Sequence, residues 1–390
     1  MTRSPRVTLA AAALATVLAA GCGSTVAGAG RAAAARAQAR LPLAASLTVP
    51  GAASWAVVEM GGSSSKFENF WQLVARRAGT ARWTLATPPG VADNGGLVAA
   101  SLGGAALVTG VNPSQDLQFS PLATTRDGGA HWSPGLLPAG LASLPSALAA
   151  GPGGRLLAIT DRGLAEMSAP GGASWARLTS LASLAATPAG RSCGLSSLTA
   201  AAFSPSGVPL LAGQCASRGV TGIFAYSGGS WRLAGPALPA GLARRRVSVL
   251  RLSTAGRSTA ALLVTAAPGG EVSLVAAWAS PAGHWALSAP LPLNGARVVS
   301  TAAAASTVGV ILSTGLADTI AGPAAPWRQL PALPAHAAAL VLGPGTQVSA
   351  LTADGSILTG WLLAAPAGTR NVGWTRTQVM KVPVPYGSSS

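Results

Sequence analysis

The stretch TTRDGGAHW, residues 124–132, places a polar, glycine-rich turn directly before a tryptophan in a chain dominated by Ala, Gly, Leu and Ser. The same arrangement, small turn residues running into a Trp, recurs at intervals of 42 to 56 residues. A period of this length marks a fold assembled from one repeated supersecondary unit. The repeat tryptophans are Trp83, Trp132, Trp175, Trp231, Trp285, Trp327 and Trp374.

Each repeat unit combines short strand-like runs with clusters of Gly, Pro, Asp and Ser. In the unit of Trp231 the runs are LTAAAFS, VPLLAGQCA and GIFAYS, and a short strand follows the Trp. Such runs predict antiparallel hairpins. Four short antiparallel strands in about 40 to 50 residues are the unit of a β-propeller. We therefore expect residues 41–390 to form an all-β, seven-bladed β-propeller of four-stranded antiparallel blades, with six or eight blades as alternatives.

The turn before Trp132 also has a family resemblance. Residues 125–132, TRDGGAHW, closely resemble the Asp-box of bacterial neuraminidase (sialidase-like) repeats, Ser/Thr-x-Asp-x-Gly-x-x-Trp; the other units keep mainly the turn and the Trp. The resemblance implies a turn between the third and fourth strands of a blade, in which Asp caps backbone amides, Gly takes a positive φ and Trp packs between blades. This is a structural role. The matching residues are Thr125, Asp127, Gly129 and Trp132.

The N-terminal segment is distinct from the repeats. A basic start precedes an apolar run over residues 7–20, shorter than the roughly 20 residues that span a bilayer. The LAAGCGS that follows resembles the lipobox of bacterial lipoproteins, which implies that residues 1–21 are a signal peptide and that Cys22 receives a diacylglycerol. Residues 22–40 are then an Ala/Gly/Arg-rich tether. An ordinary secretory signal with an incidental cysteine is the alternative.

The charge of the chain is strongly positive. The formal net charge is +16, and the five arginines before residue 41 contribute five of these charges, which leaves +11 on the repeats. Lys66 and Lys381 are the only lysines. Two interpretations fit: an anionic partner such as phospholipid headgroups or cell-wall polymers, or arginines spread over the surface through a GC-rich genome. Nucleic acid is not expected, because the exported chain lacks basic–aromatic interleaving.

Cys193 and Cys215 are the only cysteines besides Cys22. An even pair in an exported chain predicts a disulfide, with two free buried thiols as the alternative. Antiparallel pairing of the first two strands of their unit brings the two positions to the same end, so the bond would be structural. Residues 298–317, uncharged and rich in Ser and Thr, are expected to form two short strands with a tight turn instead of a membrane span.

No catalytic, metal or cofactor site is expected. HExxH, CxxC, Walker, GxSxG and EF-hand patterns are absent from the sequence, and the three histidines are scattered. A sialidase needs a Tyr nucleophile, an arginine triad and carboxylates. Tyr226 should end a third strand, on the face opposite that family's active site, and Tyr386 is in the tail. The chain has only ten Asp and Glu in all. A glycan-active, sialidase-like hydrolase is the alternative function.

A binding face is predicted where the loops between second and third strands and between blades meet. A polar rim around a central funnel is one interpretation of its charged residues; ordinary turn formers and solvated arginines are the other. Trp71, Trp278 and Trp361, on third strands, fit packing between blades better than stacking on sugars. The candidate face residues are Lys66, Asp116, Asp161, Arg244, Arg245, Arg246, Glu271 and Asp354.

The sequence as a whole predicts a non-catalytic, monomeric binding or scaffold module. It would be exported and anchored by its diacylglyceryl cysteine to the outer face of the cytoplasmic membrane, where its partner is a protein or glycan of the cell envelope. A purely architectural envelope role is a further alternative, because a fold alone does not specify a ligand.

Overall fold

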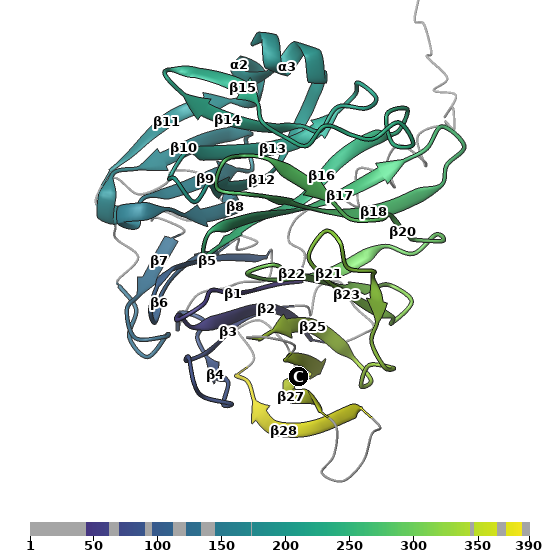
Figure 1. Ribbon diagram of the computed structural model, residues 1–390. Helices are drawn as coiled ribbons and strands as arrows, with labels where there is room; N and C mark the ends of the chain where they lie inside the picture. Colours follow the sequence, from purple (N-terminus) through teal and green to yellow (C-terminus); the bar gives the residue numbers. More distant parts are fainter. Residues whose placement is uncertain are drawn as a thin grey trace, which may run out of the picture. The chain divides into compact units, whose positions relative to one another are not determined.

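The computed structural model describes residues 44–61, 70–89, 96–111, 122–133, 145–172, 174–343, 347–364 and 372–383. The expected signal, Cys22 and tether, together with Lys66, Asp116 and Tyr386, lie outside these ranges. The described chain is nearly all β-strand (Figure 1), so the all-β prediction is confirmed. No helix in the described ranges is both long and apolar enough to cross a membrane.

Two repeat units share one sheet of eight strands. Its strands are β1 (Ala44–Thr48), β2 (Ser54–Met60), β3 (Phe70–Arg76), β4 (Thr84–Leu85), β21 (Val298–Ala304), β22 (Thr307–Leu312), β23 (Ala317–Ala321) and β24 (Arg328–Gln329). Their order is β24-β23-β22-β21-β1-β2-β3-β4. Consecutive strands pair antiparallel, but β1 and β21 pair in parallel, from Ala44↔Ser300 to Thr48↔Ala304. The two units are thus joined through their first strands.

Two further units share a sheet of nine strands. These are β12 (Leu195–Phe203), β13 (Pro209–Cys215), β14 (Ile223–Ser227), β15 (Ser230–Leu233), β16 (Arg246–Ala255), β17 (Ser258–Ala266), β18 (Val272–Ala279), β19 (Trp285–Leu287) and β20 (Leu291–Pro292). The path runs β15-β14-β13-β16-β17-β18-β19, with β12 beside β13 and β20 beside β18. The link between the units is the single pair Gln214↔Ser248 of β13 and β16.

The remaining described strands form three smaller antiparallel sheets. One contains β5 (Leu97–Gly103), β6 (Ala106–Val111) and β7 (Leu122–Thr125). The second contains β8 (Pro145–Ala150), β9 (Leu156–Thr160), β10 (Leu164–Ser168) and β11 (Trp175–Ser180), with the 3₁₀ turns η1 (Pro152–Gly154) and η2 (Pro170–Gly172). The third contains β25 (Ala337–Leu342), β26 (Val348–Asp354), β27 (Ile357–Ala364) and β28 (Gly373–Lys381). The predicted pair of strands in residues 298–317 is confirmed as β21 and β22.

Two short helices follow β11. They are α2 (Leu181–Ala185) and α3 (Pro188–Cys193), beside β12 and β15 (Figure 1). Ser180 caps α2 by accepting from the Ser183 amide, and Thr187 caps α3 by accepting from the Gly190 amide at 3.0 Å. A proline at the first helical position supports the start of α3. The sequence prediction missed this cap pattern.

The repeat tryptophans lie in apolar clusters between units. Trp132 packs with residues of β1 to β3 and β5, Trp231 with residues of β8 to β10 and β12, and Trp285 with residues of β12 to β14 and β16. Trp175, Trp327 and Trp374 occupy equivalent places. In each case the Trp contacts the unit before its own. Trp83, in the first unit, is buried against β25 to β28 in the last, so the pattern of contacts closes on itself.

Backbone hydrogen bonds fix several of these indoles. Trp285 Nε1 donates to Ala234 O at 2.6 Å, and Trp327 Nε1 donates to Ala289 O at 2.9 Å. Each acceptor lies a few residues after the Trp of the preceding unit. The two ends of the described chain are joined in a related way, because Gln378 of β28 bonds both the amide and the carbonyl of Trp83. The tryptophans therefore hold neighbouring units together by both burial and hydrogen bonding.

Candidate functional site

A cavity of about 140 Å³ lies among the first strands of six repeat units. Its walls come from β1, β5, β8, β12, β16 and β21, with β2 adding Trp55 and Val57, and they consist mainly of Ala, Leu and Val. The first strand of the last unit, β25, contributes no lining residue; it packs against β1 and β21 instead. The parallel pairing of β1 with β21 closes the wall where β25 would otherwise stand.

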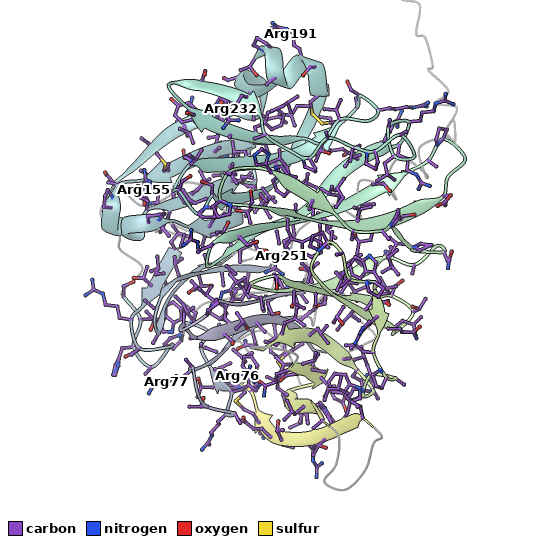
Figure 2. All side chains as sticks on the ribbon, viewed as in Figure 1. Arg76, Arg77, Arg155, Arg191, Arg232 and Arg251 are labelled. Carbon is purple, nitrogen blue, oxygen red and sulfur yellow. A yellow bond between two sulfur atoms is a disulfide. The ribbon has the colours of Figure 1, made fainter. Side chains whose placement is uncertain are left out.

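Arg251, on β16, is the charged side chain among the lining residues (Figure 2). The pairing of β16 with β17 shifts register between Val249 and Arg251, and such an irregularity can redirect a side chain. Arg251 Nη1 donates to Thr301 O and to Thr301 Oγ1, both at 2.8 Å, and Nη2 donates to Ser46 O at 2.6 Å. The guanidinium therefore bridges β21 and β1.

The electrostatic state of Arg251 is unusual. Desolvation by burial lowers the pKa of Arg251 to about 10, so the group is still protonated at neutral pH. Its three hydrogen-bond acceptors are neutral oxygens, and the described lining residues include no carboxylate. Among the described lining residues, no carboxylate neutralises the positive charge of Arg251. An arginine within the otherwise uncharged strand-like run VSVLRLS was the sequence signal, and the candidate face did not include it.

A second hollow of about 330 Å³ lies beside Arg76 and Arg77. Arg76 is buried, which lowers its pKa, and its guanidinium lies 4.9 Å from the centre of the Trp83 ring. Arg77 donates to the backbone oxygen of Asp127 at 3.1 Å. Arg76 Nη1 also donates to Ser349 Oγ of the last unit at 3.4 Å, so both arginines join the first unit to a neighbouring unit.

The predicted ligand face is only partly assembled. Arg245 Nη2 and Glu271 Oε1 form an ion pair at 3.0 Å, which holds the pKa of the Glu271 carboxyl below its usual value. Asp161 lies between β9 and β10 and Asp354 ends β26, in the expected loops, and both are exposed. Arg244 and Arg246 are also exposed, and none of these four has an ion pair within the described ranges. None of the described residues of the predicted face lines the central cavity.

The Thr125–Trp132 turn is a hydrogen-bonded structural element. Asp127 Oδ1 accepts from the His131 amide at 2.9 Å and from Thr125 Oγ1 at 2.8 Å, while Asp127 Oδ2 meets His131 Nδ1 at 2.7 Å. Gly129 has a φ of +96°, and a Cβ there would lie 2.7 Å from Ala86 Cα, so a side chain does not fit. The turn therefore packs closely against the first unit.

Replacement of Asp127 by Asn is expected to lower the thermal unfolding midpoint at pH 7. The backbone and side-chain bonds from His131 hold the pKa of the Asp127 carboxyl well below its usual range. A depressed carboxyl pKa contributes stability above the unfolded value of about 4, and that stability is lost as pH falls through the folded value. Midpoints measured from pH 7 to pH 2 should therefore converge for the two proteins. Asp161→Asn, at an exposed turn, is the control and should match the native protein throughout.

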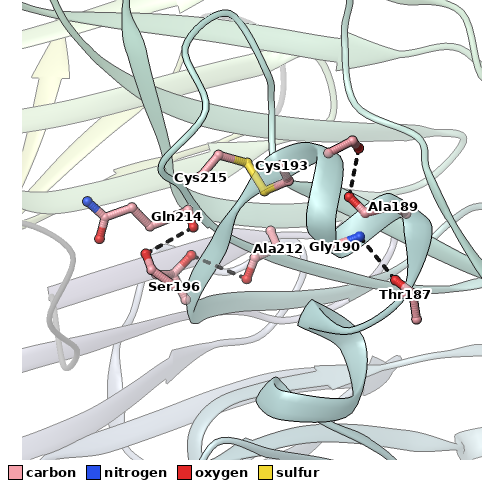
Figure 3. The surroundings of a disulfide bond; sticks show 10 residues. Thr187, Ala189, Gly190, Cys193, Ser196, Ala212, Gln214 and Cys215 are labelled. Atoms are coloured by element: carbon pink, nitrogen blue, oxygen red, sulfur yellow. Dashed lines mark hydrogen bonds between the residues drawn. A yellow bond between two sulfur atoms is a disulfide. The ribbon is translucent and has the colours of Figure 1, made fainter.

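Cys193 and Cys215 form a disulfide between the end of α3 and the end of β13 (Figure 3). Both residues are buried in the cluster between two units. Nearby, Ser196 Oγ donates to Gln214 O, which fastens the start of β12 to β13. The bond therefore ties the helical segment to its own sheet.

The other candidate aromatic and metal-binding residues have structural surroundings. Tyr226, near the end of the third strand β14, stacks on Trp231 with ring centres 5.0 Å apart, away from the cavity lining. Trp71 and Trp278 are buried between units, and Trp361 donates to Thr352 Oγ1 at 3.1 Å. Among the described residues, no group of His, Cys, Asp or Glu could hold a metal ion.

Comparison with known proteins gives likeness in structure alone. No protein-family model and no curated protein matches the chain. A protein from Lactobacillus plantarum is 12% identical with a TM-score of 0.50, over 85% of this chain and 96% of that one. YCF48 from Cyanidioschyzon merolae is 16% identical with a TM-score of 0.43, over 82% and 95%. A six-bladed β-propeller lectin from Aleuria aurantia is 13% identical with a TM-score of 0.40, over 89% and 96%. Each of these likenesses is below 25% sequence identity and concerns the fold alone.

Proposed function

We propose that this chain is a non-catalytic, lipid-anchored, extracytoplasmic β-propeller that acts as a binding or scaffold module for a protein or glycan of the cell envelope. The observation that favours binding over catalysis is the composition of the central cavity. Glycoside hydrolysis uses two carboxyl groups about 5 to 10 Å apart. The described lining residues offer one arginine, several hydroxyls and no carboxylate.

The proposed propeller has seven four-stranded blades. Seven repeat tryptophans each occupy a separate contact between units, and the contact of Trp83 with the last unit completes the series. The eight- and nine-stranded sheets are then pairs of blades joined at β1–β21 and β13–β16. The hydrogen bonds of Asp127 support assignment of its turn as an Asp-box.

The proposed location rests on the N-terminal sequence. The lipobox-like LAAGCGS would give a diacylglyceryl Cys22 at the outer face of the cytoplasmic membrane, with residues 23–40 as spacer. The Cys193–Cys215 disulfide supports an oxidising compartment. The exposed arginines, including Arg244 and Arg246, offer positive charge to an anionic envelope component.

The proposal predicts saturable binding without turnover. The full chain is incubated with a glycan array and with cell-wall and membrane-protein fractions, and with a chromogenic sialoside and common aryl glycosides. We expect binding to at least one fraction and no hydrolysis. Simultaneous replacement of Arg244, Arg245 and Arg246 by Ala should weaken binding if the predicted face is used, whereas Arg191→Ala, in the exposed part of α3, is the control. Hydrolysis of any glycoside would contradict the non-catalytic assignment.

A further inference from the structure

Arg251 is a cation without a counter-ion. The two ion pairs within the described ranges, His131–Asp127 and Arg245–Glu271, do not involve it. Arg251 is half-buried. A charge that is partly removed from water is costly unless it is paired, so such a group favours an anion that reaches it. The same desolvation lowers the pKa of Arg251, because it disfavours the protonated, charged form.

The guanidinium also has unused donors. An arginine offers five N–H groups, and a carboxylate takes two of them side by side. Nη1 bonds both oxygens of Thr301, and Nη2 uses one hydrogen on Ser46 O. In the described chain, Nε–H and the second hydrogen of Nη2 have no acceptor. In an arginine, Nε–H and the adjacent Nη2 hydrogen point the same way from one edge of the planar group, which is the arrangement that a carboxylate accepts.

The remainder of the cavity wall is mainly apolar, apart from the hydroxyl groups of Ser101, Ser146, Thr199, Ser253, Thr254 and Thr301. Leu47, Ala99, Leu148, Ala201 and Leu252 represent the five strands β1, β5, β8, β12 and β16 that surround Arg251. The lining hydroxyls of Thr199 and Thr254 already donate to backbone oxygens, at 2.6 and 2.5 Å. A ligand here therefore needs one charged end and a hydrocarbon body. A volume of about 140 Å³ is close to the roughly 150 Å³ cavity that accepts benzene in an engineered protein.

We propose that the central cavity binds a small organic monocarboxylate, whose carboxylate pairs with Arg251 and whose body, about the size of a six-membered ring, packs on the Ala and Leu walls. This inference rests on the proposed binding role and names the ligand class of one site within it. A single positive charge matches a single negative one. Inorganic phosphate or sulfate has no apolar body to fill the remaining space, and an uncharged ring leaves the guanidinium unpaired.

The test is calorimetric titration of the full-length chain with benzoate, benzamide and inorganic sulfate at constant ionic strength. We expect one benzoate per chain, with benzamide and sulfate each at least tenfold weaker. Equal affinity for benzoate and benzamide, or absence of benzoate binding, would overturn the proposal. These comparisons use the native chain and do not depend on the folding of a variant.

Substitutions of Arg251 test whether benzoate binds at this residue. Arg251→Gln should reduce benzoate affinity at least tenfold. Arg251→Lys keeps the charge but not the paired N–H donors, so its benzoate affinity should lie between those of the native chain and Arg251→Gln. Arg232→Gln, exposed on β15 and outside the predicted ligand face, is the matched control and should bind like the native chain. Unchanged binding in a folded Arg251→Gln protein would overturn the assignment. If benzoate fails to bind while the envelope fractions still do, this inference fails and the proposed function stands; if neither binds, both fail.

Discussion

Reduction of the Cys193–Cys215 disulfide is expected to lower the free energy of unfolding by about 3 kcal/mol, because the bond restricts the unfolded chain between two cysteines with a sequence separation of 22. The measurement is urea unfolding of the full chain with and without a phosphine reductant. The Cys193→Ala/Cys215→Ala protein should unfold like the reduced native protein, apart from the small loss of buried sulfur. Identical midpoints for oxidised and reduced protein would contradict the expected contribution.

Reduction should also have a local effect. Cys193 fastens the end of α3, and Arg191, two residues earlier, is exposed and bonds Ala186 O within the same segment. Trypsin should therefore cut after Arg191 faster once the disulfide is reduced, because the helix end is no longer held to β13. Cleavage after Arg232, exposed on β15, is the internal control, since β15 pairs with β14 and is not tied by the bond.

The repeat architecture could be predicted because its signals are local. A turn of small residues followed by Trp marks each unit, and the tryptophans do lie in the contacts between units. The disulfide follows because β12, which begins two residues after Cys193, pairs with β13, which ends at Cys215. Residues 298–317 could be assigned to β21 and β22 because a Ser/Thr-rich apolar stretch in phase with the repeat fits a hairpin better than a membrane span.

The central site could not be predicted in the same way, because it depends on contacts between distant strands. The parallel pairing of β1 with β21 joins residues more than 250 positions apart and excludes β25 from the cavity wall. Arginines also occur on outer strands, where Arg177 and Arg232 are exposed. Only the position of its strand within the unit distinguishes Arg251 from these two arginines. The candidate face was predicted from loop residues, and Arg251 lies on a first strand.

Replacement of Phe203 by Ala is expected to destabilise the protein by about 3 to 5 kcal/mol, the usual cost of deleting a buried phenyl group. Phe203 ends β12, is buried, and lines the central cavity. Arg155, from the preceding unit, lies over its ring at 5.6 Å, and a Cβ on Gly151 would lie 2.6 Å from it. The neighbouring unit is therefore shaped around this ring, and the space left by the substitution should remain open.

That space adjoins the proposed carboxylate site, which gives the substitution a second readout. The enlarged cavity should accept a two-ring carboxylate, so the affinity ratio of 2-naphthoate to benzoate should rise by about tenfold or more, since each buried CH₂-sized group contributes about 0.8 kcal/mol. Phe224→Ala is the matched control: Phe224 is buried in the same cluster but does not line the cavity. It should lose similar stability in urea unfolding and keep the native ratio. A change of ratio in both variants would indicate general loosening, whereas a change in Phe203→Ala alone locates the ligand among the first strands.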